Sequence, residues 1–237
     1  MIDPNKKEPL PVNASDVCYR AFELIATKQY ADAEKLLALN MSRTDDDASI
    51  ALYHSVMGVL FKVQGEYKSA WKHYQRAEKL LPEDPALKII SARLLIEQFA
   101  EYDQAIKKAK KVLELIPGNP VFAHQACTTM GLAYFKKSDR RKAVEMLKAS
   151  CGEDFRGFVS AKNIDFALVE VLLRREIGLA ECREFLSKAL AFAQGTAEDA
   201  YVKLIAKMLA AFDEENPAVA EAAPDEPTES RDITEGI

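Results

Sequence analysis

A short phrase recurs down this chain: a tyrosine, or a residue in its place, precedes a small residue by three positions, and a helical apolar run follows. The phrase reads Tyr30–Ala33, Tyr67–Ala70, Tyr102–Ala105, Arg140–Ala143 and Leu179–Cys182. The small residues recur at intervals of roughly 35 to 40 residues, the length of one helix-turn-helix unit. One such unit cannot bury its apolar side alone, so the sequence predicts an all-α solenoid of stacked repeats.

The second repeat shows the fullest pattern. It places glycine, aromatic and small residues where two antiparallel helices must approach closely, and proline where the second helix ends, at Gly58, Phe61, Tyr67, Ala70, Tyr74, Ala77 and Pro82. This pattern resembles the tetratricopeptide (TPR) repeat, with His54 where that family often has tryptophan. The resemblance covers roughly residues 14 to 196. It implies a right-handed superhelical solenoid of about five TPR-like helix pairs.

Two repeats depart from the pattern. The third has Arg93, and the fifth Glu170, where a small residue is expected. We therefore expect the fifth repeat to be the least regular.

Local signals divide the chain into three parts. Residues 1–13 hold three prolines and are expected to be extended. Residues 14–213 form the solenoid, ending in a capping helix over about residues 197–213, with Asp45–Asp47 suited to cap an earlier helix. Beyond Phe212, nine carboxylates face a single arginine, so we expect residues 214–237 to be a disordered acidic tail.

Composition excludes several classes of protein. The sequence has no apolar run long enough to span a bilayer, and its first residues lack the apolar core of a signal peptide, so we expect a cytoplasmic protein without membrane insertion. The four cysteines are widely spaced without ligand-like histidines nearby, which favours buried reduced thiols. No phosphate-binding loop, metal-binding motif or nucleophile motif occurs, so the sequence favours a protein that is not an enzyme and uses no cofactor or metal.

The TPR resemblance implies that the first helix of each repeat lines a concave face. The residues expected to form a partner-binding groove there are Phe22, Ile25, Ser55, Val59, Ile90, Leu94, Thr128, Leu132, Phe135 and Val171. The central row of this set is apolar in every repeat, whereas the lysine, arginine and asparagine of a peptide-carboxylate clamp are largely missing. An apolar groove suits an amphipathic helix or an extended peptide with hydrophobic anchors. The sequence thus predicts a protein-interaction module, such as an adaptor, assembly factor or chaperone-like binder.

Three alternatives stay open. The groove residues could be buried by tight curvature, or by Leu10–Val12 or the final helix folding back. The chain could assemble with itself, by packing the terminal helix of one molecule into the groove of the next. A basic edge of Lys136, Lys137, Arg140, Arg141, Lys142, Arg174 and Arg175 could bind an acidic partner or nucleic acid. Nucleic acid is disfavoured, because no aromatic residues for base stacking are interleaved with these cations.

Overall fold

The structure, a computed structural model, describes residues 13–221 and is all-α in that range. The helices form five successive pairs: α1 (Ala14–Ala26) with α2 (Tyr30–Met41), α3 (Asp47–Val63) with α4 (Tyr67–Leu80), α5 (Pro85–Leu94) with α6 (Tyr102–Leu115), α7 (Pro120–Lys136) with α8 (Arg140–Ser150), and α9 (Ala167–Leu173) with α10 (Leu179–Gln194). Two further helices, α11 (Asp199–Glu215) and α12 (Pro217–Glu221), follow. The predicted all-α superhelical repeat is confirmed.

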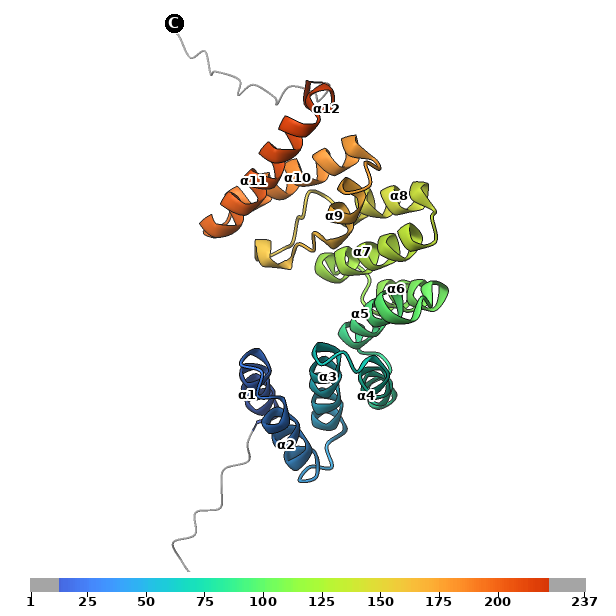
Figure 1. Cartoon of the computed structure of the whole chain (residues 1–237), viewed down its shortest axis with the longest axis vertical. Coiled ribbons are helices and arrows are strands. Elements are labelled where there is room, and N and C mark those ends of the chain that lie inside the picture. Colours follow the sequence, from blue (N-terminus) through green and yellow to red (C-terminus); the bar gives the residue numbers. More distant parts are fainter. Residues whose placement is uncertain (1–12, 222–237) are drawn as a thin grey trace, which may run out of the picture.

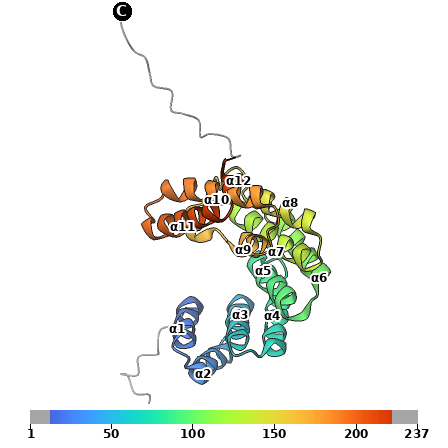
Figure 2. The same ribbon diagram turned by 45° about the horizontal axis from the view of Figure 1, so that its top comes forward.

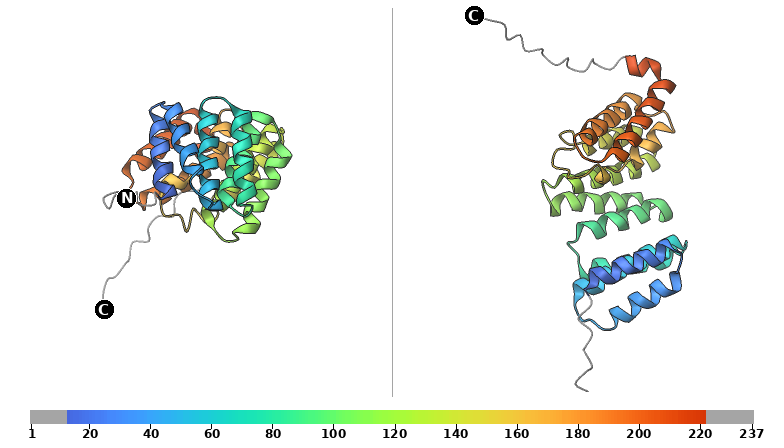
Figure 3. Two further views of the ribbon diagram at one scale, coloured as in Figure 1. Left: turned by 90° about the horizontal axis from the view of Figure 1, so that it is seen from below. Right: turned by 90° about the vertical axis from the view of Figure 1, so that its left-hand side faces the viewer.

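The pairs stack into a curved ladder. In Figures 1 and 2, α3, α5 and α7 lie on the inner side of the curve, and α4, α6 and α8 lie on its outer side. The right-hand view of Figure 3 shows the pairs following one another along the long axis. We call the surface on the side of α1, α3, α5 and α7 the inner face. None of the described helices is long and apolar enough to cross a lipid bilayer.

Capping fixes where the first helix of each early repeat begins. The side chains of Asn13, Asp46, Asp84 and Asn119 each accept a hydrogen bond from a backbone amide in the first turn, at 2.8 to 3.1 Å. Each bond satisfies an amide that has no partner inside its helix. The cap expected within Asp45–Asp47 is thus provided by Asp46.

Small residues set how closely the helices of a pair approach. The recurring Ala33, Ala70, Ala105, Ala143 and Cys182 are all fully buried. A Cβ atom added to Gly58 would lie 2.2 Å from the ring of Tyr74, which leaves no room for any side chain there. The small residues that define the repeat in the sequence are therefore the residues at which the two helices of a pair pack together.

The third repeat has one residue more than its neighbours between the buried small residue of its first helix, Ala92, and that of its second helix, Ala105. A π-helical turn, Leu95–Phe99, follows α5 and absorbs this residue. Before the turn the register is shifted by one, so Ala92 rather than Arg93 is the fully buried small residue. After the turn, the third repeat is again aligned with the second. The salt bridge between Glu97 and Lys62 of the second repeat, at 2.7 Å, is the evidence for this alignment. The unexpected Arg93 thus reflects an insertion, and the small-residue contact is kept.

The fifth repeat is irregular, as its weak pattern predicted. Residues 151–166 carry only a short 3-10 turn, Ala161–Asn163, before the brief α9. An aromatic cluster forms around this segment from Phe155, Phe158, Phe166, Phe185 and Phe192, several of whose rings meet edge to face. Aromatic packing takes the place of a regular first helix here.

The C-terminal boundary differs from the prediction. Residues 214–221, expected to belong to a disordered tail, complete α11 and form α12. Val219 packs against the C-terminal core, and Asp213 accepts hydrogen bonds from Arg183 at 2.8 and 3.2 Å, which ties α11 to α10. The remainder of the predicted tail, and residues 1–12 of the predicted extended segment, lie outside the described residues.

Candidate functional site

The inner face of the first two repeats exposes large apolar side chains. Phe22 of α1 is 45% exposed, and Leu52 and Val63 of α3 are 37% and 53% exposed. Helical spacing places Leu52, Val59 and Val63 on one side of α3, opposite the buried Gly58. Phe22 follows Ala21 as Val59 follows Gly58, so it occupies the matching place in the first repeat. Together, Phe22, Leu52, Val59 and Val63 form one surface, which we call the apolar strip.

The salt bridge between Lys62 and Glu97 shows which way this side of α3 points. The two side chains meet at 2.7 Å, and both remain more than one third exposed. Since one lies on α3 and the other in the turn after α5, the contact runs between consecutive first helices of the ladder. This salt bridge therefore lies at the polar edge of the apolar strip.

Seven of the ten residues predicted to line the groove are accessible. Phe22 is exposed, and the others are half-buried: Ser55, Val59, Ile90, Leu132, Phe135 and Val171. Ile90, Leu132, Phe135 and Val171 also pack against the core, so they offer edges rather than whole side chains to a partner. Accessible apolar surface is thus concentrated on α1 and α3.

The other three predicted groove residues are buried, and the prediction was wrong for them. Leu94 is fully buried against Ala70 and Tyr74 because the one-residue insertion rotates it away from the inner face. Ile25 turns into the core cluster that contains Val56. Thr128 is buried because its helix α7 packs against α5, α6, α8 and α9.

Sequence reasoning missed Leu52, Val63 and Tyr19. The first two flank the predicted stripe on α3, and a wider stripe of about 100° would have included them. Tyr19, 69% exposed, corresponds to the buried Val56 of the second repeat. It is exposed because no earlier helix among the described residues covers that side of α1.

A polar network connects α5, α7 and α8 with the irregular segment before α9. Arg93 Nε donates to Thr129 Oγ1 at 2.9 Å, and its guanidinium pairs with Asp165 of the irregular segment. The backbone amide of Asp165 donates to His124 Nε2 at 2.7 Å, so His124 carries its proton on Nδ1, which donates to the Ser150 carbonyl at 2.9 Å. Burial lowers the pKa of His124, which fits a neutral ring. All these groups are partnered, which indicates a structural role.

The predicted basic edge is largely neutralised. Lys137 pairs with Asp103, Arg141 with Glu145 at 2.7 Å, Lys142 with Asp139 at 3.2 Å, and Arg174 with Glu170 at 3.2 Å. Lys136, Arg140 and Arg175 are exposed. Because most of these cations have a carboxylate partner, the edge attracts an acidic ligand less than the sequence alone implied.

The four cysteines are buried free thiols, as expected. Burial raises the pKa of Cys18 to about 11 and the pKa values of Cys151 and Cys182 to about 12. Thiols with such pKa values are protonated at neutral pH and are poor nucleophiles. No cluster of three or more histidine, cysteine and carboxylate side chains suited to a metal ion occurs within residues 13–221.

Comparison with known proteins gives fold neighbours only. No family model matches the sequence, and no curated protein matches it. Among solved structures, PilF of Pseudomonas aeruginosa aligns with a TM-score of 0.57 and 17% identity over 88% of this chain and 87% of its own. PilW, described as a widely conserved type IV pilus biogenesis factor, aligns with a TM-score of 0.59 and 14% identity over 90% of this chain and 96% of its own. The APC/C hetero-tetramer Cut9-Hcn1 aligns with a TM-score of 0.58 and 14% identity over 89% of this chain and 39% of that chain.

This chain has a TPR-like helical-repeat fold. The neighbours are TPR-containing proteins, and they share its paired-helix ladder over most of its length. At such low identity the likeness concerns the fold alone. The surface that this chain uses must therefore be inferred from its own exposed residues.

Proposed function

We propose that this TPR-like protein is a non-catalytic interaction module whose inner face, at the first two repeats, binds an apolar or amphipathic peptide segment of a partner protein. The observation that carries the proposal is the exposure of Phe22, Leu52 and Val63 along one face. Large apolar side chains gathered on an exposed surface are typical of interaction sites. The apolar face of a helix, or alternate side chains of an extended peptide, would cover such a strip.

Glutamate substitutions in the apolar strip test this proposal. The probe is the best-binding member of a displayed library of amphipathic helical peptides selected on the full-length chain. Burying a phenylalanine or valine contributes about 1.5 to 3 kcal/mol, so the double variant Phe22→Glu, Val63→Glu should bind the probe at least about 10-fold more weakly. Both side chains are exposed, so circular dichroism should show unchanged helicity.

Leu39→Glu is the matched control. Leu39 is 48% exposed, close to the 45% of Phe22, but it lies on α2, the second helix of its repeat. The control should keep full affinity. Equal binding of the probe by the double variant and the wild type, or failure of the library to yield any binder, would contradict the proposal. Leu94→Glu is unsuitable, because a charge at a fully buried position would unfold the repeat.

Self-assembly is a second candidate, favoured by one observation at the end of the ladder. Leu204 of the terminal helix α11 is 50% exposed. Packing of this residue against the apolar strip of another molecule would be a head-to-tail contact. Sedimentation velocity should then show concentration-dependent growth that Leu204→Glu abolishes. A monomer at all concentrations would exclude this candidate.

A further inference from the structure

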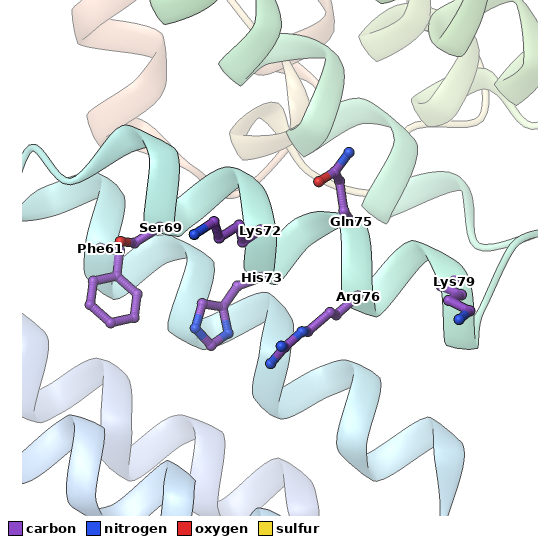
Figure 4. A pocket seen from close by; sticks show the side chains of 7 residues that line it. All are labelled: Phe61, Ser69, Lys72, His73, Gln75, Arg76 and Lys79. Atoms are coloured by element: carbon purple, nitrogen blue, oxygen red, sulfur yellow. The ribbon is translucent and has the colours of Figure 1, made fainter.

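A hollow along α4, on the outer side of the ladder, gathers basic side chains. Its volume is about 370 Å³, and its lining residues are Phe61, Ser69, Lys72, His73, Gln75, Arg76 and Lys79. All but Phe61 come from α4 (Figure 4). Figure 4 shows Phe61, His73 and Arg76 on the same side of that helix. The hollow is separate from the apolar strip, because α4 belongs to the outer side of the curve (Figure 1).

The cations of this hollow have no carboxylate partner in the part of the chain that the structure describes. Neither Lys72, Arg76 nor Lys79 forms a salt bridge with any residue in the range 13–221, whereas four members of the predicted basic edge do. Among the described residues, the carboxylates of α4 and its N-cap, Glu78 and Glu66, do not pair with these cations. Glu66 accepts a hydrogen bond from Ser69 at 3.3 Å, and Glu78 is held by Lys108 of α6 at 2.7 Å. The hollow therefore holds three cations without a salt bridge inside the described part of the fold, although the Glu66 carboxylate is bonded to Ser69 of its lining.

One histidine, His73, lines the hollow and contacts a second histidine, His54, which does not line it. His73 stacks on Phe61, with ring centroids 5.2 Å apart, and its Nδ1 lies 3.0 Å from Nδ1 of the buried His54. One of these nitrogens must donate and the other must accept. With His54 as donor, His73 carries its proton on Nε2, which then provides a further donor to a ligand. Burial, with the nearby His54 and Arg76 charges, lowers the pKa of His73 to about 4, so the ring is neutral in the empty site.

These groups match the chemistry of a phosphate ester. A guanidinium can bind two phosphate oxygens at once, and lysine ammonium groups neutralise the remaining charge. A phosphate ester carries close to two negative charges at neutral pH and has three acceptor oxygens, whereas a carboxylate offers one charge and two oxygens. Single-stranded nucleic acid fits less well, because it needs successive free aromatic faces, and Phe61 already stacks on His73.

We propose that the α4 hollow binds a phosphorylated serine or threonine side chain of a partner peptide. Arg76 and Lys72 are the principal contacts, and Lys79 strengthens the attraction from one turn beyond Arg76. Such a site would let phosphorylation of a partner control its binding to the outer side of the ladder, independently of the apolar strip. Failure at one site leaves the other untouched, since the two share no residue.

The test compares one peptide library in two forms. Short peptides of mixed flanking sequence, with a central phosphoserine or the same serine unmodified, are titrated into the full-length chain by fluorescence polarisation. The phosphorylated pool should bind at least 10-fold more tightly, and inorganic phosphate should compete with it. Arg76→Ala should weaken its binding at least 10-fold. Lys107→Ala on α6, an exposed lysine without a salt bridge within the described residues, is the matched control and should bind normally.

A second readout locates the ligand. Because Arg76 is exposed, its replacement leaves the fold intact, which a thermal melt verifies. Imidazole proton resonances of His73 should shift on titration of the phosphorylated pool, while those of His124 stay fixed. Equal binding of both pools, normal binding by Arg76→Ala, or shifts that leave His73 unchanged would overturn the proposal. Binding of single-stranded RNA without binding of the phosphorylated pool would assign the hollow to nucleic acid instead.

Discussion

A residue in the left-handed backbone conformation lies between the two helices of each of the first four repeats. These residues are Lys28, Gly65, Ala100 and Ser138, with φ angles of 61°, 81°, 56° and 63°. Each precedes the recurring small residue by five positions. Only one of the four is glycine, although this conformation costs other residues roughly 1 to 2 kcal/mol. The turn is therefore imposed by the packing of the helices it joins.

Substitutions in this turn should change stability in opposite directions. No heavy atom beyond its chain neighbours lies within 4 Å of a Cβ built at Gly65, so Gly65→Ala acts through the backbone alone and should lower the free energy of unfolding by about 1 kcal/mol. Ala100→Gly relieves the same strain and should raise it by a few tenths to about 1 kcal/mol. Urea denaturation measures both changes. Equal effects of the same sign would show that the turn is not strained.

The histidine pair should make stability depend on pH. The pKa of His73 is lowered to about 4 in the folded protein, against about 6.5 in the unfolded chain, and the pKa of His54 is lowered as well. The unfolded state thus binds more protons below pH 6.5, so stability is complete above that pH and falls as the pH drops toward 4. The slope for His73 cannot exceed about 1.4 kcal/mol per pH unit, because one ring binds at most one proton, and it should stay below this limit because the ring is only half-buried. Urea titrations at pH 7.5, 6 and 5 should show a shallower decline for His73→Gln than for the wild type, and parallel curves would contradict this assignment.

At the scale of single elements, the π-helical turn of the third repeat can be tested by deletion. Gln98 is an exposed residue of that turn, and removing it should leave a continuous α-helix with the usual spacing between its buried small residue and the next helix. Ala92 and Glu97 both precede the deleted residue, and the deletion only converts the π-helical turn into a regular α-helical turn. We therefore expect a melting temperature within a few degrees of wild type. Deleting Gln125 in α7, which has no such turn to absorb the change, shifts the buried run Ala126–Gly131 and should unfold the fourth repeat. Thermal melts followed by circular dichroism distinguish the two, and severe destabilisation by the Gln98 deletion would show that the turn is itself required.

The third repeat shows why sequence predicted the elements better than the site. The recurring small residues sufficed to find the helix pairs, because their spacing reflects packing inside one repeat. The orientation of Leu94 depended on a single inserted residue, and the partner of Arg93, Asp165, lies in an irregular segment far along the chain. No periodic pattern records such a contact. The basic hollow on α4 was missed for a related reason: its cations were visible in the sequence, but their lack of partners was not.

At the scale of the whole molecule, each repeat is expected to depend mainly on its neighbours, so damage at one end should stay local. The terminal helix α11 covers the last repeat with Ile205, fully buried, and Phe212, 4% exposed. Ending the chain at Glu198 removes both residues and the pairing of Asp213 with Arg183. Exposing these apolar contacts should destabilise α9 and α10 by several kcal/mol, since each large buried side chain contributes about 1.5 to 3 kcal/mol.

Hydrogen exchange can locate that loss. In the chain ending at Glu198, amide protection should fall in α9 and α10 and persist in α1 to α4, which belong to the first and second repeats, four and three repeats away (Figure 1). A chain ending at Glu221 keeps every described contact and is the control, with protection expected to match the wild type. A uniform loss of protection from α1 to α10 would mean that the repeats unfold as one cooperative unit. The apolar strip on α1 and α3 would then depend on the terminal helix for its shape, and peptide binding there would be lost in the same truncation; with local unfolding, that binding survives.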